Sequence, residues 1–293
     1  MIPPRVWGYM ALQVSIWSLT ATVEAVTLRG LTPLQFSAWS TCSGALASLI
    51  FLFSTGRGRC LLNYSGKDYL VLGILSILGF SGYQVLKFTA YTLVPIPQAN
   101  ILQNTYPIFI VIFALPFLGQ PITFNKIIGI TLGFLGAAII LSGGKLFALD
   151  WANLNGYLLA LGAGISWGLF SVLAARASFD PVSSMFFMQL FSSFIIFSIL
   201  ITGGMFTVPS GLSTIGGAFY SGVLSNVVGV LLWLAAQRST EDVSRITGLL
   251  YLVPFLSLFA LRVFLGFPIS GYAYIGLVCI VGGATFHHIR SRK

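Results

Sequence analysis

Charged residues are scarce in this chain. They make up 7% of its 293 residues, and six of them are acidic. A soluble domain usually carries about 25% charged residues, so this composition cannot cover a water-exposed surface. Because 57% of the residues are hydrophobic, most of the surface is expected to face lipid. The sequence therefore predicts an all-α integral membrane protein.

Cysteines and catalytic motifs are also few. Cys42, Cys60 and Cys279 lie far apart without a CxxC pair, so neither a metal site nor a disulfide framework is predicted. The chain has no HExxH motif and no P-loop, which argues against a zinc protease and an ATP-driven pump. It also has no rings of like charge or filter repeats, which argues against a channel. No cofactor is expected.

The formal net charge of +9 does not indicate nucleic-acid binding. The basic residues are scattered singly between apolar blocks, so they form no basic face. They are better explained as determinants of orientation in a membrane. We therefore expect no nucleic-acid partner, and a lipid bilayer as the surroundings.

Long apolar blocks occupy most of the chain. A membrane-spanning helix needs about 20 mostly apolar residues, and ten segments meet this requirement. They are Trp7–Leu28, Leu34–Ser54, Asp68–Leu93, Gln98–Leu118, Phe124–Leu141, Asn153–Arg176, Val182–Thr202, Ser213–Gln237, Val243–Leu265 and Gly271–His288. The breaks between them carry turn residues, such as Pro95-Ile96-Pro97.

The basic residues test this count. If ten helices alternate from a cytoplasmic N-terminus, eleven of the 15 Lys and Arg residues fall on the cytoplasmic side. The other four lie in the outer half. This bias follows the positive-inside rule. It predicts a multi-pass protein of the cell (inner) membrane with both termini in the cytoplasm.

The chain also repeats itself. The segment Leu118-Gly119-Gln120-Pro121 recurs as Leu265-Gly266-Phe267-Pro268, an offset of 147 residues. The same offset relates Gly82 to Gly229 and Pro107 to Pro254. We therefore expect two five-helix repeats, residues 1–145 and 146–293, within one membrane domain. Because five is odd, the second repeat is expected to be inverted, as in many alternating-access transporters.

The repeated residues resemble the EamA-type branch of the drug/metabolite transporter superfamily. The marks recur in both halves: a tryptophan in the first helix, a proline opening the second, a proline in the fourth, and a Leu-Gly-x-Pro link. They are Trp17 and Trp167, Pro33 and Pro181, Pro107 and Pro254, and the two links above. The link often carries Glu after Gly in this family. Gln120 and Phe267 stand there instead, so no role of that carboxylate carries over.

The resemblance also suggests a cargo. The stretch from Gln98-Ala99-Asn100 to Tyr106-Pro107 is similar to the aromatic amino-acid exporter branch of the family. The resemblance implies export of amino acids and related small metabolites through a central cavity.

Polar side chains inside a membrane are expected to face the interior of the bundle. At helical spacing they gather on the first, third and fourth helices of each half. The predicted substrate-binding residues are Trp17, Glu24, Tyr83, Gln84, Lys87, Asn100, Gln103, Asn104, Trp167, Ser171, Trp233 and Tyr251. Aromatic walls with amides that both donate and accept suit a zwitterion with an apolar side chain.

Two of these residues, Glu24 and Lys87, are charged. Lys87 would attract a substrate carboxylate, and Glu24 would meet its amine or carry a coupling proton. The alternatives are a mutual ion pair between the first and third helices, or snorkelling to the outer interface.

Helix-breaking residues predict where the bundle bends. Gly79 and Gly82 in the third helix, and Pro107 and Pro254 in the fourth helix of each half, are candidate hinges. A GxxxG motif at Gly129 indicates either close packing within the bundle or a dimer seam. We therefore expect a monomer or a homodimer.

The leading hypothesis is a secondary transporter that exports amino acids with aromatic or large apolar side chains. One alternative is transport of another metabolite or drug, such as a quaternary amine or a nucleoside. The remote alternative is a membrane-embedded enzyme or a channel.

Overall fold

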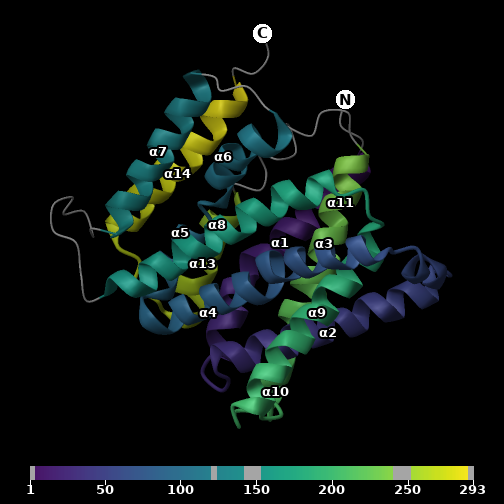
Figure 1. Cartoon of the computed structure of the whole chain (residues 1–293). Helices are drawn as coiled ribbons and strands as arrows, with labels where there is room; N and C mark the ends of the chain where they lie inside the picture. Colours follow the sequence, from purple (N-terminus) through teal and green to yellow (C-terminus); the bar gives the residue numbers. More distant parts are fainter. Residues whose placement is uncertain (1–3, 120–123, 142–152, 240–251, 290–293) are drawn as a thin grey trace.

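The computed structural model describes residues 4–119, 124–141, 153–239 and 252–289 (Figure 1). These residues form helices joined by short turns, and no strand occurs in those four ranges. The predicted all-α class is therefore confirmed over this part of the chain.

The helices follow the predicted apolar segments closely. The first half comprises α1 Pro4–Thr27, α2 Pro33–Ser54, η1 Gly58–Leu62, α3 Gly66–Ser76, η2 Ile77–Ser81, α4 Gly82–Leu93, α5 Ile96–Gln103, α6 Tyr106–Leu118 and α7 Phe124–Leu141. The second half comprises α8 Leu154–Arg176, α9 Pro181–Thr202, α10 Leu212–Phe219, η4 Tyr220–Gly229, α11 Val230–Arg238, α13 Leu252–Leu265 and α14 Gly271–Ile289. The first part of the predicted segment Val243–Leu265 lies outside the described residues.

Six helices or runs of consecutive helices in the described residues are long and apolar enough to cross a bilayer. They are Pro33–Ser54, Gly66–Leu93, Ile96–Leu118, Leu154–Arg176, Pro181–Thr202 and Leu212–Trp233. Shorter apolar helices occur at Ile127–Ile139, Leu252–Leu265 and Gly271–Gly283. The chain is thus a multi-pass membrane protein, while the count of ten spans stays a prediction.

Local sequence explains where several helices begin. Thr32 and Gln35 form a capping box at the start of α2, and Ser65 and Asp68 form another at α3. Each box satisfies two backbone N–H groups that the first helical turn leaves free. Asp180 caps α9 by accepting from the backbone N–H of Ser183.

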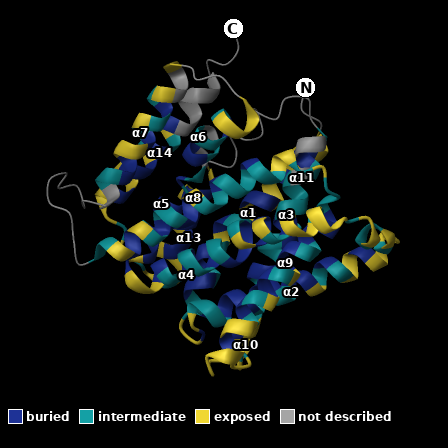
Figure 2. Cartoon of the chain, viewed as in Figure 1, coloured by how far each residue is buried: buried dark blue, intermediate teal, exposed yellow. Residues whose placement is uncertain are grey.

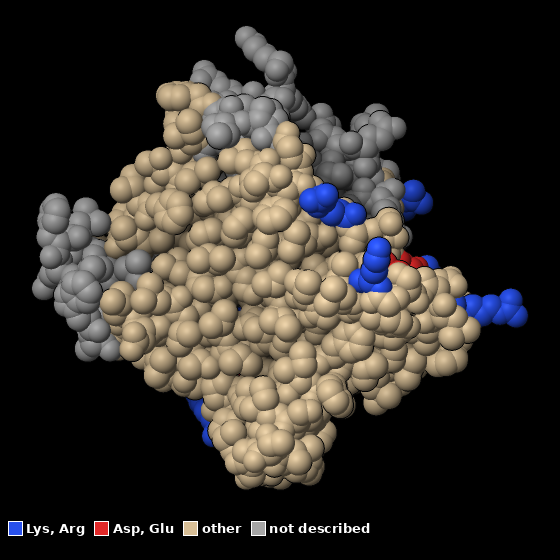
Figure 3. Space-filling model, in the orientation of Figure 1, with Lys and Arg blue, Asp and Glu red and all other residues tan. Residues whose placement is uncertain are grey.

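The outer surface of the described chain is largely apolar. Large side chains such as Phe53, Phe194, Leu212 and Phe264 are exposed (Figure 2). On the face in Figure 3, charged side chains are few and most lie on the right of the view. A surface of this kind is expected where lipid is the solvent.

Helices α7 and α14 pack against each other along their length (Figure 1). A Cβ on Gly136 would contact the carbonyl of Gly276, and one on Gly283 would contact the carbonyl of Gly129. The GxxxG glycines therefore serve close packing within the chain. The oligomeric state stays a prediction.

Two long segments are interrupted by π-helices. η2, at Ile77–Ser81, separates α3 from α4, and η4, at Tyr220–Gly229, separates α10 from α11. Adding the repeat offset of 147 to residues 77–81 gives 224–228, which lie inside η4. Equivalent segments of the two halves therefore carry the same irregularity, which is often found at functional sites.

The predicted hinge residues lie at or near helix irregularities. Gly79 is in the middle of η2, and Gly82 begins α4 with its N–H bonded to the carbonyl of Ile77. Pro107 is the second residue of α6, directly after the break between α5 and α6. Pro254 is the third residue of α13 and is buried. Their role as hinges stays a prediction.

Candidate functional site

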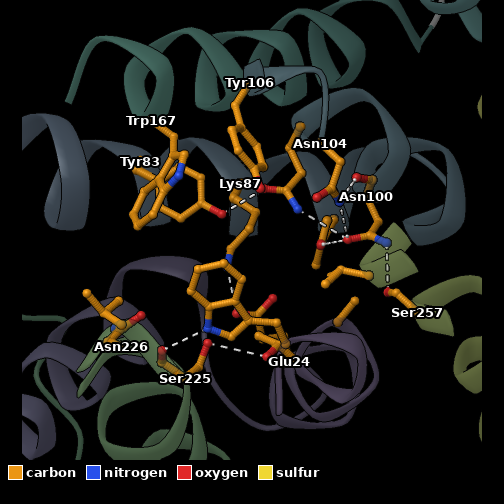
Figure 4. A pocket seen from close by; sticks show the side chains of 17 residues that line it. Glu24, Tyr83, Lys87, Asn100, Asn104, Tyr106, Trp167, Ser225, Asn226 and Ser257 are labelled. Carbon is orange, nitrogen blue, oxygen red and sulfur yellow. Dashed lines mark hydrogen bonds and ion pairs between the residues drawn. The ribbon is translucent and has the colours of Figure 1, made fainter. Parts of the chain in front are cut away.

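A cavity of about 80 Å³ lies between the two halves, near the centre of the bundle (Figure 4). Its lining comes from α1, α4, α5, α6, α8, η4, α11 and α13, and from Asn104, which follows α5. The lining residues are Trp17, Thr20, Ala21, Glu24, Tyr83, Lys87, Tyr91, Asn100, Gln103, Asn104, Tyr106, Trp167, Ser225, Asn226, Val230, Val253 and Ser257.

Eight of the predicted substrate-binding residues line this cavity. They are Trp17, Glu24, Tyr83, Lys87, Asn100, Gln103, Asn104 and Trp167. The structure thus brings together polar residues from helices far apart in the chain. Their role in binding a substrate stays a prediction.

Four predicted residues are not in the described lining. Gln84 is buried outside the cavity, because it lies one helical step from Tyr83. The hydroxyl of Ser171 donates to the backbone carbonyl of Trp167 at 2.7 Å. Trp233 packs beside the cluster formed by Val6, Met10 and Ala236. Tyr251 lies outside the described residues.

The position of Trp233 has a physical cause. An α-helical reading places residues 226 and 233 on one face, because they are seven positions apart. In η4 the hydrogen bonds run over five residues instead of four, so each residue turns less about the axis. Asn226 therefore faces the cavity while Trp233 faces another direction.

Glu24 and Lys87 form an ion pair inside the cavity. Lys87 Nζ lies 2.6 Å from Glu24 Oε1, and the side chains are 6% and 3% exposed. The ammonium also lies 4.9 Å from the ring centroid of Tyr83 and 4.6 Å from that of Phe88. Lys87 therefore points inward, which differs from the predicted alternative of snorkelling to an interface. The mutual ion pair is present, and it lies in the wall of the cavity.

An amide network forms another part of the wall. Tyr83 donates its hydroxyl to Gln103 Oε1 at 2.7 Å, and Gln103 Nε2 donates to Asn100 Oδ1 at 3.2 Å. Tyr91 also donates to Asn100 Oδ1, at 3.1 Å. Asn100 Nδ2 in turn donates to Ser257 Oγ of α13 at 2.8 Å. Asn100 therefore joins α4 and α5 of the first half to α13 of the second.

The break between α5 and α6 also faces the cavity. Asn104 Nδ2 donates to the backbone carbonyl of Asn100 at 2.6 Å and so satisfies a carbonyl at the end of α5. Pro107 has no N–H to continue the ladder of helical hydrogen bonds. The side chain of Asn104 thus stabilises an interrupted helix beside the cavity.

Aromatic rings face the cavity from two directions. Trp167 of α8 lies 4.9 Å from Tyr83 and 6.5 Å from Tyr106, measured between ring centroids. Trp17 of α1 donates its indole N–H to the backbone carbonyl of Ser225 at 3.1 Å. Flat apolar walls with single polar groups suit an aromatic or large apolar ligand.

The sequence-based prediction did not include several lining residues. Tyr91 lies four residues after Lys87, so the helical spacing contained a usable signal. Tyr106 follows the break between α5 and α6, and Ser225 lies in a π-helix, where α-helical spacing does not apply. Ser257 lies in α13, and its hydroxyl meets Asn100 of the other half. Their positions required the tertiary structure.

One sequence pattern resembles a hydrolase motif. Gly164-Ile165-Ser166-Trp167-Gly168 matches the form G-x-S-x-G, whose serine normally lies on a turn between a strand and a helix. Here the pattern lies in the middle of α8, and the Ser166 hydroxyl donates to the carbonyl of Leu78 at 2.6 Å. The described residues also contain no group of three His, Cys, Asp or Glu side chains that could hold a metal ion.

Known proteins resemble this chain along nearly its whole length. An uncharacterized transporter from Archaeoglobus fulgidus is 24% identical over 284 residues, covering 94% of this chain and 98% of the relative. The aromatic amino acid exporter YddG from Ancylobacter novellus is 25% identical over 292 residues, covering 95% of each. A probable terminal-alkyne amino-acid exporter from Streptantibioticus cattleyicolor is 26% identical over 300 residues, covering 96% of each.

A solved structure shares the fold of this chain, and a family model matches its sequence. A solved structure titled "Crystal structure of protein" matches with a TM-score of 0.69 at 20% identity, covering 96% of each chain. The model of the EamA-like transporter family matches twice, at residues 7–142 and 154–287. The chain therefore belongs to the EamA-like transporter family of multi-pass membrane proteins.

Proposed function

We propose that this chain is a secondary transporter that exports amino acids with aromatic or large apolar side chains, by alternating access through the central cavity. The observation that carries the proposal is the buried Glu24–Lys87 pair beside the aromatic residues Trp17, Tyr83 and Trp167. Two relatives named as amino-acid exporters support this cargo class.

The charge of the cavity supports a zwitterion. Glu24 and Lys87 are the charged residues of the described lining, and their charges cancel. An amino acid can exchange partners with this pair, placing its carboxylate on Lys87 and its ammonium on Glu24. Such exchange leaves the total charge unchanged and keeps every charge paired, which a low-dielectric interior requires. A polyanion would leave unpaired negative charge.

The architecture that we propose has ten spans in two inverted repeats, residues 1–145 and 146–293, with both termini in the cytoplasm of the cell (inner) membrane. Gly79 and Gly82 at η2, and Pro107 and Pro254 in α6 and α13, would act as hinges. The π-helices and the break at Asn104 support this proposal, because interrupted ladders bend at lower cost than continuous helices.

Transport by purified protein in proteoliposomes tests the proposal. Labelled phenylalanine, tyrosine, tryptophan and leucine are compared with glutamate, lysine, a quaternary amine and a nucleoside, with and without a pH gradient. We expect flux of the neutral amino acids and little flux of the charged ones. Absence of flux for every amino acid would overturn the proposal. Flux of the amine or the nucleoside alone would support the alternative cargo.

Variants test the site itself. Lys87→Ala and Trp167→Ala are both expected to lose most flux, because one removes the partner of the substrate carboxylate and the other removes an aromatic wall. Wild-type flux in both variants would contradict the assignment of this cavity. If Glu24→Gln retains flux but loses the dependence of that flux on the pH gradient, proton coupling is assigned to Glu24.

A further inference from the structure

One amide in the cavity wall lacks a hydrogen-bond partner. Asn226 lines the cavity, and its Nδ2 is buried with no partner among the described residues. The amides of Asn100, Gln103 and Asn104 all have partners. Because a buried N–H donor without a partner destabilises a folded protein, the presence of one in a binding cavity points to a ligand that accepts from it.

Two hydrogen bonds between η4 and α1 fix the position of Asn226, which lies in η4. The hydroxyl of Tyr220 donates to the carbonyl of Ile16 at 2.7 Å, and the indole of Trp17 donates to the carbonyl of Ser225 at 3.1 Å. The position of the amide is therefore set before any ligand arrives.

An aromatic side chain lies near Asn226. The indole of Trp17 donates to the carbonyl of Ser225, the residue before Asn226. In Figure 4, Asn226 lies at the lower left of the cavity and Trp167 at the upper left, whereas Asn100 and Ser257 lie on the right. A zwitterionic head group bound at the Glu24–Lys87 pair can therefore direct an aromatic side chain to the left of this view, within reach of Asn226.

We propose that Asn226 determines specificity by hydrogen-bonding the polar atom of an aromatic side chain. Its Nδ2, which has no partner among the described residues, would donate to a phenol oxygen. This assignment rests on the proposed function. It predicts that the transporter favours tyrosine over phenylalanine.

The other half does not offer a second such group. The repeat offset of 147 relates Asn226 to Gly79 of η2. A Cβ on Gly79 would meet the ring of Phe170, so that position is filled by a neighbour and cannot carry an amide. Of the two equivalent positions, 79 and 226, the second therefore carries an amide and the first does not.

The test is the variant Asn226→Leu, which keeps the volume of the side chain and removes the amide. Initial rates for tyrosine, tryptophan and phenylalanine are measured in proteoliposomes. We expect the tyrosine-to-phenylalanine ratio to fall by about three- to tenfold, the range that one net hydrogen bond supplies. The matched control is Ser221→Ala in the same π-helix. Its buried hydroxyl lies outside the cavity lining, so the ratio should not change.

A binding measurement keeps the test decisive if the variant loses flux. Thermal unfolding of purified protein is followed with saturating tyrosine or phenylalanine. Tyrosine should stabilise the wild type more than phenylalanine, and the two should stabilise Asn226→Leu equally. An unchanged ratio in both assays would overturn the role of Asn226. If the wild type carries no amino acid, it is the proposed function that fails. If it carries leucine but none of these three amino acids, the role of Asn226 is overturned.

Discussion

Trp17 donates its indole N–H to the backbone carbonyl of Ser225, a residue 208 positions further along the chain. A second bond has the equivalent geometry: the Ser166 hydroxyl donates to the carbonyl of Leu78. The repeat offset of 147 relates Leu78 to Ser225. In both places the first long helix of one half satisfies a carbonyl in the π-helix of the other. These two bonds connect the first half of the chain to the second.

The first prediction concerns the bond made by Trp17. Trp17→Phe removes the indole N–H and keeps an aromatic ring, so the carbonyl of Ser225 loses its donor. We expect a loss of about 0.5–1.5 kcal/mol in the free energy of unfolding and a several-fold lower flux. Thermal unfolding and proteoliposome transport provide the two measurements.

Trp39→Phe is the matched control for this change. Trp39 also donates to a backbone carbonyl, that of Thr207 at 2.9 Å, but on an exposed part of the chain away from the cavity. Its flux should remain near the wild-type value. Equal flux losses in the two variants would show that the Trp17 bond has no special role.

The second prediction concerns Ser166, which does not line the cavity. Ser166→Ala leaves the Leu78 carbonyl without its donor, so the relative positions of α8 and η2 are expected to change. The maximal rate of transport should fall while the apparent affinity for substrate stays near the wild-type value. A change confined to affinity would instead place Ser166 in the binding site.

The third prediction separates the contribution of the Glu24–Lys87 pair to stability from its role in binding substrate. Lys87→Met or Glu24→Gln alone leaves an unpaired buried charge, which is expected to lower stability by about 3–5 kcal/mol. The double variant removes both charges and should recover most of that loss. Because no charged group then meets a zwitterion, its flux should stay low. Thermal unfolding and uptake of labelled phenylalanine measure the two effects, and full flux in the double variant would contradict a role in binding.

The fourth prediction tests the packing of α7 on α14. Gly136→Leu places a side chain against the backbone of α14, because a Cβ added at Gly136 would meet the carbonyl of Gly276. Overpacking of this kind is expected to cost about 1–3 kcal/mol. Gly73→Ala is the control, because a Cβ there has nothing within 4 Å. If Gly136→Leu unfolds at the wild-type temperature, the close approach of these helices does not contribute to stability.

Much of the fold was readable from hydropathy. The predicted segments Leu34–Ser54 and Phe124–Leu141 correspond to α2 and α7 within one residue at each end. Lipid explains this success, since a spanning helix must satisfy its own backbone and present apolar side chains outward. Glu24 and Lys87 were recognisable for the same reason, because charges in such helices are expected to face the interior.

The pattern of residues by itself thus determined the class of protein, the helical segments, the family and most of the polar cavity lining. The tertiary structure decided that the Lys87 ammonium meets Glu24 and not an interface, since a sequence cannot show whether an ammonium reaches an interface or a carboxylate on another helix. It also decided which face of η4 meets the cavity. A π-helix turns each residue by less than an α-helix does, so α-helical spacing puts Trp233 on the same face as Asn226. In the structure Asn226 lines the cavity and Trp233 does not, and the buried Nδ2 of Asn226 has no partner among the described residues.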